Sequence, residues 1–206
     1  MTGPVMNDLK PLRIIALSLL VGGVLIGCSS NSDPVQSPPL EGAALGGDFE
    51  LVDENGETVR EADFAGQNRI VYFGYTFCPD VCPVDMQKLG QAMRILEQSN
   101  TELVERITPI FVSVDPGRDT PDVLVEFTDN FHPRMIGMSG SREAIDAAAE
   151  RYGVYYALGE DDGSGNYLVD HSNNAILFGP EGAPLAILPL QDSPDVIAEA
   201  LIRWAR

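Results

Sequence analysis

Apolar residues in this chain fall into short continuous runs and into runs spaced three or four residues apart. The continuous runs predict buried strands at residues 69–75, 107–114, 167–169, 175–178 and 186–189. The spaced runs predict amphipathic helices that begin after Pro83, at Thr120, at Ser141 and at Ser193. Because strands and helices follow one another along the chain, the pattern predicts an α/β sandwich with a partly parallel sheet.

Residues 1–28 have a different pattern and are predicted to lie outside the fold. Lys10 and Arg13 precede an apolar run at residues 14–26, which is shorter than the roughly 20 residues that span a bilayer. A basic start followed by a short apolar run is typical of an export signal. The sequence LIGC that ends at Cys28 resembles the lipobox of bacterial lipoproteins. This implies a lipidated Cys28 and a membrane-anchored protein of the bacterial cell envelope, facing the periplasm or the cell exterior. The alternative is a plain signal peptide or a short anchor in which the cysteine is incidental.

Composition separates a predicted tether from a folded domain, and the net charge argues against one class of partner. Residues 29–45 are rich in Ser, Asn, Pro and Gly, which predicts a flexible tether and a folded domain over residues 46–206. Apolar residues make up 44% of the chain, enough for one packed core. The formal net charge is −18, from 13 Lys+Arg and 31 Asp+Glu. Phosphate backbones would repel such a chain, so nucleic acid is not an expected partner.

Cys78 and Cys82, in the sequence TFCPDVCP, are the two cysteines that remain if Cys28 carries a lipid. A domain of about 160 residues needs no disulfide to fold, so the pair is predicted to have a chemical role. The pair follows the predicted strand 69–75 at the start of a helix, where backbone N–H groups and the helix dipole stabilise a thiolate. If this turn is helical, the two Cα atoms lie roughly 6 Å apart on one face. The pair can then bind a metal when reduced or form a disulfide when oxidised, and the spacing does not decide between them.

Further ligands are few. Two thiolates favour Cu(I), with zinc as a competitor, and either ion needs at least one more ligand. His132 and His171 are the two histidines in the chain. His132 follows a predicted helix end, which favours a structural role or a charge partner at the helix terminus. His171 follows a predicted strand, and an isolated histidine there is also more often structural. Met86, one helical turn beyond Cys82, is more often a core residue than a ligand.

Four blocks of sequence, in this order, resemble the Sco/SenC family of copper proteins: TFCPDVCP, SVDPGRDTP, FHPRMIGMSGS and YLVDHSN. The resemblance covers most of residues 46–206 and implies a thioredoxin-like fold with a central mixed sheet flanked by helices. It also implies that Cys78, Cys82 and His171 are the copper ligands, because they match the two cysteines and the histidine of the family's motifs. Such a site suits Cu(I), and Cu(II) could be held with an added ligand.

The same resemblance implies a copper metallochaperone that delivers copper to the binuclear copper centre of cytochrome c oxidase subunit II, with another copper chaperone as a conceivable donor. One alternative is a thiol–disulfide oxidoreductase, in which Cys78 and Cys82 reduce the copper-ligand cysteines of the acceptor. Another is a redox or copper sensor. Thioredoxin-like oxidoreductases usually have two residues between their cysteines and a proline before the facing strand, whereas residues 170–174 contain no proline. Both features favour metal binding without excluding dithiol exchange.

Overall fold

The computed structural model describes residues 36–206 except 161, 162 and 164. The predicted export signal and Cys28 lie outside these residues. Leu40 and Leu45, which belong to the predicted tether, pack against the hydrophobic core, and the Leu40 N–H donates to the Leu185 carbonyl at 3.0 Å. Within the described residues, no helix is long and apolar enough to cross a membrane.

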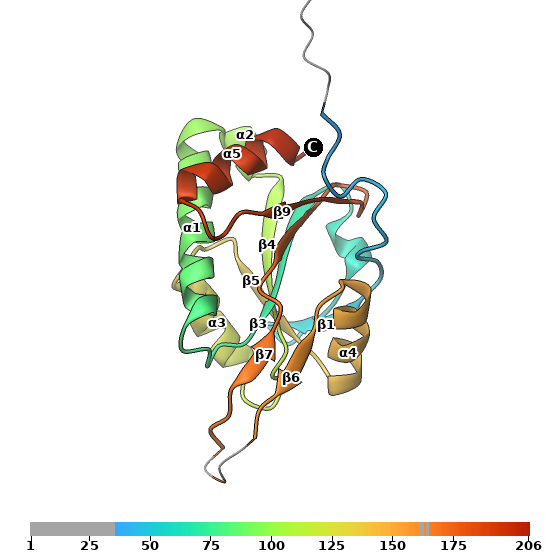
Figure 1. The fold of residues 1–206 in the computed structure, drawn as a ribbon, viewed down its shortest axis with the longest axis vertical. Helices are drawn as coiled ribbons and strands as arrows, with labels where there is room; N and C mark the ends of the chain where they lie inside the picture. The colour runs from blue at the N-terminus through green and yellow to red at the C-terminus, as the bar shows by residue number, and fades with distance from the viewer. Residues whose placement is uncertain (1–35, 161–162, 164) are drawn as a thin grey trace, which may run out of the picture. The chain divides into compact units, whose positions relative to one another are not determined.

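The central sheet of the described part of the chain has the strand order β2-β1-β5-β4-β3-β8-β9 (Figure 1). The bounds of these strands are β1 Glu50–Asp53, β2 Thr58–Arg60, β3 Asn68–Gly74, β4 Ile107–Ser113, β5 Ile136–Ser139, β8 Ala175–Phe178 and β9 Pro184–Leu188. Strands β3, β4 and β5 are parallel, whereas β8, β9, β1 and β2 join antiparallel. The sheet is therefore mixed, as predicted.

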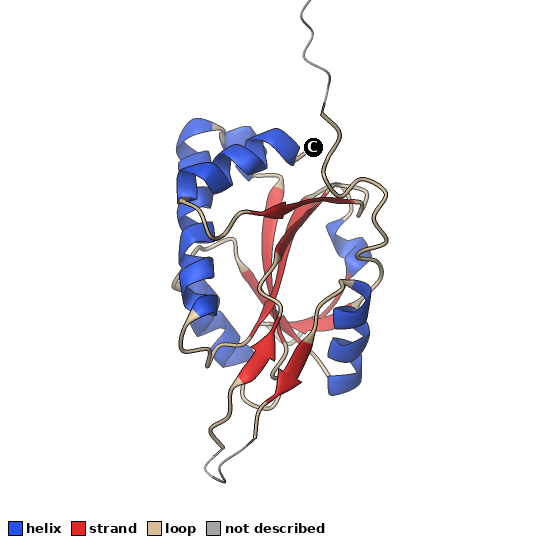
Figure 2. Ribbon diagram, viewed as in Figure 1, coloured by secondary structure: helices blue, strands red, loops and turns tan. Residues whose placement is uncertain are grey.

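Helices cover both faces of this sheet (Figure 2). Their bounds are η1 Glu61–Phe64, α1 Val81–Ser99, α2 Thr101–Val104, α3 Pro121–Asp129, α4 Arg142–Arg151 and α5 Pro194–Trp204. Helices α1, α3 and α5 lie on one side of the sheet and α4 lies on the other. Helix α1 begins two residues before Pro83, which is tolerated because the first turn of a helix needs no partner for its N–H groups.

A separate two-stranded ribbon carries one of the candidate ligands. Strands β6 (Tyr156–Leu158) and β7 (Val169–His171) pair antiparallel, with Tyr156 opposite His171. The ribbon extends beyond one end of the central sheet in Figure 1. The strand predicted at residues 167–169 therefore lies two residues further along, because pairing with β6 sets its bounds. His171 is the last residue of this strand.

His132 has the structural role that its position predicted. The side chain is fully buried, and its Nε2 atom lies 3.2 Å from the Glu97 carboxylate on α1. Its Nδ1 atom accepts a hydrogen bond from the Arg134 N–H at 3.2 Å. His132 thus connects the segment after α3 to the C-terminal end of α1, whereas Cys82 lies at the other end of this helix.

We expect the folded protein to lose stability as the pH falls from 7.5 to 5.5, and His132 to account for part of the loss. Burial lowers the pKa of His132 below its ordinary value of 6.5, against the opposing attraction of Glu97. The unfolded chain then binds a proton at pH values where the folded protein does not, so this stability is present above the unfolded pKa and is lost as the pH falls. Urea unfolding of wild type and His132→Asn at both pH values tests this. An identical pH dependence in the two proteins would assign the effect to another group.

Candidate metal centre

Cys78 and Cys82 flank the first residue of α1. Strand β3 ends at Gly74, and a turn leads from it to Cys78, three residues before the helix begins at Val81. A helical turn that contains both cysteines is therefore not formed, because Cys78 lies outside the helix. Instead, the Cys82 N–H donates to the Cys78 Sγ at 3.5 Å. The Cys78 sulfur thus lies at the N-terminus of α1, within hydrogen-bond distance of a backbone N–H group.

His171 faces the cysteine pair from the end of β7. Its Nε2 atom lies 3.2 Å from the Cys82 Sγ, and its Nδ1 atom lies 3.0 Å from the Ser172 carbonyl oxygen. A proton on Nδ1 would be donated to this carbonyl and would leave the Nε2 lone pair directed at the sulfur. The rings of Tyr72 and Tyr75 meet the imidazole edge-on, with centroids 6.2 and 5.8 Å away. The histidine is therefore oriented by a hydrogen bond and by packing.

The three side chains converge on one point. One ligand atom from each of Cys78, Cys82 and His171 lies within 4.8 Å of the other two. Among the described residues, this is the group of His, Cys, Asp and Glu side chains whose arrangement could hold a metal ion. Both cysteines are free thiols, with exposed fractions of 8% for Cys78 and 0% for Cys82. Two soft sulfur ligands and an imidazole fit Cu(I).

The local environment keeps the inner cysteine protonated in the metal-free protein. Burial raises the pKa of Cys82 well above its ordinary value of 9.0, and the neighbouring Cys78 adds to this. Hydrogen bonds from the Tyr75 backbone and the Tyr72 side chain act in the opposite direction. A bound cation would stabilise the thiolate and displace this proton. Metal binding at this site would therefore release at least one proton.

A buried carboxylate holds the backbone just before Cys78. Asp119 accepts hydrogen bonds from the Thr76 N–H at 2.9 Å and the Thr76 hydroxyl at 2.6 Å. It also accepts from the Ser113 hydroxyl at the end of β4, at 2.5 Å. Burial raises the pKa of Asp119, whereas these hydrogen bonds lower it. Asp119 therefore fastens the cysteine-bearing turn to the central sheet.

Arg118 connects the cysteine-bearing turn to the segment that carries His171. Its Nε atom donates to Asp115 at 2.5 Å, and the Tyr167 hydroxyl donates to the other oxygen of Asp115 at 2.6 Å. The guanidinium carbon lies 3.7 Å from the Tyr167 ring centroid and 5.1 Å from that of Phe77. These residues belong to the block SVDPGRDTP, for which the sequence pattern predicted no role. Two acids and an arginine directly after a buried strand were the signal that could have identified them.

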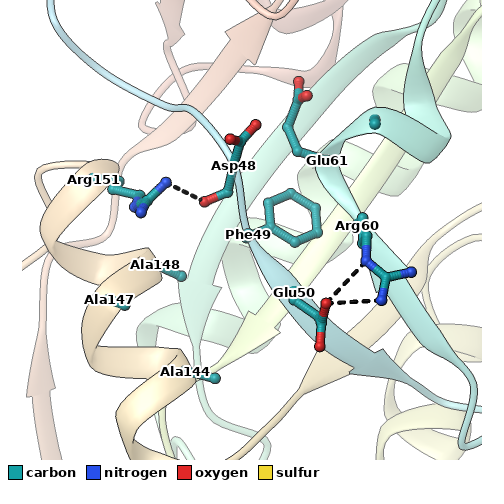
Figure 3. A pocket seen from close by; sticks show the side chains of 10 residues that line it. Asp48, Phe49, Glu50, Arg60, Glu61, Ala144, Ala147, Ala148 and Arg151 are labelled. Carbon is teal, nitrogen blue, oxygen red and sulfur yellow. Dashed lines mark hydrogen bonds and ion pairs between the residues drawn. The ribbon is translucent and has the colours of Figure 1, made fainter.

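A pocket of about 540 Å³ lies between η1, β1 and α4 (Figure 3). Three alanines of α4 line one side of it, and both of its arginines have partners. Arg60 pairs with Glu50 at 2.8 Å, and the Arg151 guanidinium donates to the Asp48 carbonyl at 2.8 Å. None of the three candidate ligands lines this pocket. It is therefore separate from the candidate metal centre.

Comparison with known proteins identifies the family. The model of the SCO1/SenC family matches residues 37–206. The chain belongs to the SCO1/SenC family. An SCO2-like protein of Rickettsia felis is 37% identical over 198 residues, covering 91% of this chain and 94% of its relative. Protein SenC of Rhodobacter capsulatus is 40% identical over 159 residues, covering 77% of this chain and 70% of SenC.

Solved Sco structures confirm the predicted thioredoxin-like fold. ScoI of Bradyrhizobium japonicum, solved with copper bound, matches with a TM-score of 0.71 and 32% identity, over 78% of this chain and 99% of ScoI. Yeast Sco1 with copper bound matches with a TM-score of 0.71 and 33% identity, over 77% of this chain and 87% of Sco1. The SCO1/SenC fold therefore accounts for the mixed sheet and its flanking helices.

Proposed function

We propose that this SCO1/SenC protein is a copper metallochaperone that binds copper through Cys78, Cys82 and His171. The observation that carries the proposal is the convergence of two thiols and an imidazole within 4.8 Å, from positions 89 residues apart. Copper-bound relatives from Bradyrhizobium japonicum and yeast support the choice of metal. The Sco protein BsSco is described as a member of a family of cytochrome c oxidase assembly proteins. We therefore propose the binuclear copper centre of cytochrome c oxidase subunit II as the acceptor.

The exposure of the three side chains suggests an order of events. The metal is cargo, and Cu(I) is the form that this ligand set favours. Cys82 is fully buried, whereas Cys78 is 8% exposed and His171 is partly exposed. Ligands of a donor or acceptor protein would therefore reach the metal from the side of Cys78 and His171. Cys82, on the buried side of the site, would be the last of the three ligands to release the metal.

The second candidate function is thiol–disulfide exchange with the acceptor. It is favoured by the position of the Cys78 sulfur, which accepts an N–H hydrogen bond at the start of α1. The Cys78 thiolate would attack an acceptor disulfide and form a mixed disulfide, and the Cys82 thiolate would then displace the acceptor. The acceptor would leave with two reduced thiols, and this protein would carry a Cys78–Cys82 disulfide. A sensor would use the same disulfide as its signal.

We also propose that Cys28 is lipidated and that the lipid holds the protein at a membrane of the cell envelope. The support is the sequence LIGC after a short apolar run. Residues 36–206 would then lie in the periplasm or at the cell exterior. An oxidising compartment of this kind requires that the two thiols be protected by copper or re-reduced after oxidation.

A Cu(I) titration tests the metallochaperone. We expect the reduced full chain in detergent to bind one Cu(I), and His171→Ala to bind it about a hundredfold more weakly. The estimate uses structural zinc sites as a reference. Such sites bind their metal with about 10–16 kcal/mol through four ligands, or about 3 kcal/mol for each ligand. Affinity is measured by competition with a Cu(I) chelator. His132→Asn is the matched control, because it alters the other histidine and should leave binding unchanged.

The same titration separates the two candidate functions. Copper binding that is weak in wild type and insensitive to His171→Ala would contradict the metallochaperone. If the same reduced protein then reduced a disulfide in a peptide acceptor, the oxidoreductase function would replace it.

A further inference from the structure

The ribbon of β6 and β7 carries His171 but is not part of the central sheet. Backbone hydrogen bonds hold its two segments together. The Gly159 N–H donates to the Leu168 carbonyl at 2.7 Å, and the Ser172 N–H donates to the Tyr155 carbonyl at 2.9 Å. These bonds fix the place of His171 within the ribbon, whereas the place of the ribbon over the cysteine pair depends on its contacts with the rest of the domain.

The first of these contacts fastens the segment just before β7. The Tyr167 hydroxyl and the Arg118 Nε atom both donate to Asp115, at 2.6 and 2.5 Å, and the guanidinium lies over the Tyr167 ring. Asp115 is fully buried two residues beyond the end of β4, where its N–H donates to the Ser113 hydroxyl at 3.0 Å. Tyr167 is therefore tied, through an ion pair, to the end of a central strand.

The second contact fastens β6. Arg142, the first residue of α4, donates from one Nη1 atom to the Val114 carbonyl at 2.9 Å and to the Tyr156 hydroxyl at 3.1 Å. The Tyr156 hydroxyl donates in turn to Asp146, one helical turn further along α4. Tyr156 lies opposite His171 in the ribbon. Each strand of the ribbon is thus held by an arginine, and both arginines bind residues that directly follow β4.

The same end of β4 also supports the cysteine-bearing turn. The Val114 N–H donates to the carbonyl of Gly74, the last residue of β3, at 2.8 Å. From Gly74 the chain runs directly into the turn that carries the cysteine pair. The candidate histidine and cysteine ligands are therefore positioned from the same pair of buried strand ends.

We propose that Arg118 and Arg142 are positioning residues that hold the ribbon in place and so set the distance between His171 and the cysteine pair. The inference rests on the proposed copper function and deepens it by giving a role to two residues that are not ligands. A metal site keeps its affinity only if its ligands are held close to their bound arrangement, and residues behind the ligands supply that support. Two attachments, one on each strand, also resist the rotation that a single attachment would allow.

Removing both attachments should weaken Cu(I) binding even though all three ligands remain. We expect Arg118→Gln and Arg142→Gln each to weaken it about fivefold and the double variant about thirtyfold, as estimated for lost hydrogen bonds that involve charged groups. The loss should stay below the loss of about a hundredfold expected for His171→Ala, because the arginines act through the histidine. Chelator competition on the reduced full chain in detergent measures these affinities.

Two further readouts distinguish positioning from a general loss of stability. In the His171→Ala background, the double arginine substitution should change Cu(I) affinity by less than about twofold, since no histidine is left to position. In the metal-free protein, the amides of Val169–His171 should exchange with solvent about tenfold faster in the double variant, whereas those of β4 should keep their wild-type rates. Hydrogen exchange therefore reports the attachment of the ribbon without any copper.

A milder substitution tests the first attachment alone. Tyr167→Phe keeps the ring beside Arg118 and removes only the hydroxyl that donates to Asp115. We expect it to weaken Cu(I) binding about threefold, as estimated for one hydrogen bond to a charged group. If the double arginine variant does not fold, this variant decides, and wild-type affinity in Tyr167→Phe would then overturn the proposal.

The controls alter similar residues that do not attach the ribbon. Arg151 lies on the same helix as Arg142, but its guanidinium donates to the Asp48 carbonyl, so Arg151→Gln should match wild type. Tyr155 belongs to the segment that enters the ribbon, and its side chain is exposed, so Tyr155→Phe should also match wild type.

The outcomes separate this proposal from the function on which it rests. Suppose that wild type binds Cu(I) through His171. The positioning role is then overturned, and the metallochaperone stands, if the double arginine variant matches Arg151→Gln or loses the same factor with and without His171. If wild type fails to bind Cu(I), the metallochaperone is overturned, and hydrogen exchange still decides whether the two arginines hold the ribbon.

Discussion

Replacing Cys82 with serine is expected to abolish tight Cu(I) binding. A hydroxyl is a hard, protonated group that does not replace a soft thiolate, and the buried position leaves no room for another ligand to enter. We expect the affinity to fall by at least about a hundredfold, the share of one ligand in a typical metal site. Chelator competition on the reduced full chain measures this loss.

The Cys82→Ser result is compared with substitutions of the other two cysteines. Cys78→Ser should weaken binding by a comparable factor, because it removes the other sulfur. Cys28→Ser should leave the copper stoichiometry unchanged, because that cysteine is predicted to carry a lipid rather than a metal. Wild-type affinity in Cys82→Ser would show that the ligand set is wrong, whatever the behaviour of Cys78.

Asp119→Ala is expected to destabilise the fold by about 3 kcal/mol, as estimated for the loss of three hydrogen bonds that leaves one buried and two partly buried donors without partners. The Thr76 N–H, the Thr76 hydroxyl and the Ser113 hydroxyl would all lose their acceptor. Copper affinity should also fall, because Thr76 holds the turn that carries Cys78. Urea unfolding measures the stability, and chelator competition measures the affinity.

The controls for Asp119 separate the hydrogen bonds from the charge. Asp119→Asn keeps one acceptor oxygen and should cost less than Asp119→Ala. Asp122→Ala removes an exposed acid from the first turn of α3 and should change neither stability nor copper affinity appreciably. Equal stability of Asp119→Ala and wild type would contradict the role of Asp119 as a fastening for the cysteine-bearing turn.

The long strands and helices could be predicted because their patterns are local. Strand β4 is fully buried, and its continuous apolar sequence identified it to within one residue. Strands β1, β2, β5 and β6 were not predicted. They are three or four residues long, and several of their side chains are partly exposed, so no run of apolar residues distinguishes them from loops. Their strand character depends on pairing with a neighbour.

The candidate ligands also differ in whether neighbouring residues alone could identify them. The closely spaced cysteines and their place between a strand and a helix were evident from neighbouring residues. His171 was singled out by a resemblance to known motifs, whereas the residues around it favoured a structural role. In the structure, pairing of β7 with β6 directs the imidazole to the cysteine pair, at 3.2 Å from the Cys82 sulfur.

The sequence alone determined that this chain forms an α/β domain with a closely spaced cysteine pair at a strand–helix junction. Apolar periodicity and cysteine spacing are properties of residues close together in the chain, so they can be recognised without knowledge of the fold. Only the tertiary structure decided that Arg118 and Asp119 hold the cysteine-bearing turn and that Asp85 faces Tyr72 in the core. Along the chain, an acid on an apolar helix face is only a break in the pattern. Its partner comes from a strand earlier in the chain, and packing of the helix on the sheet brings the two together.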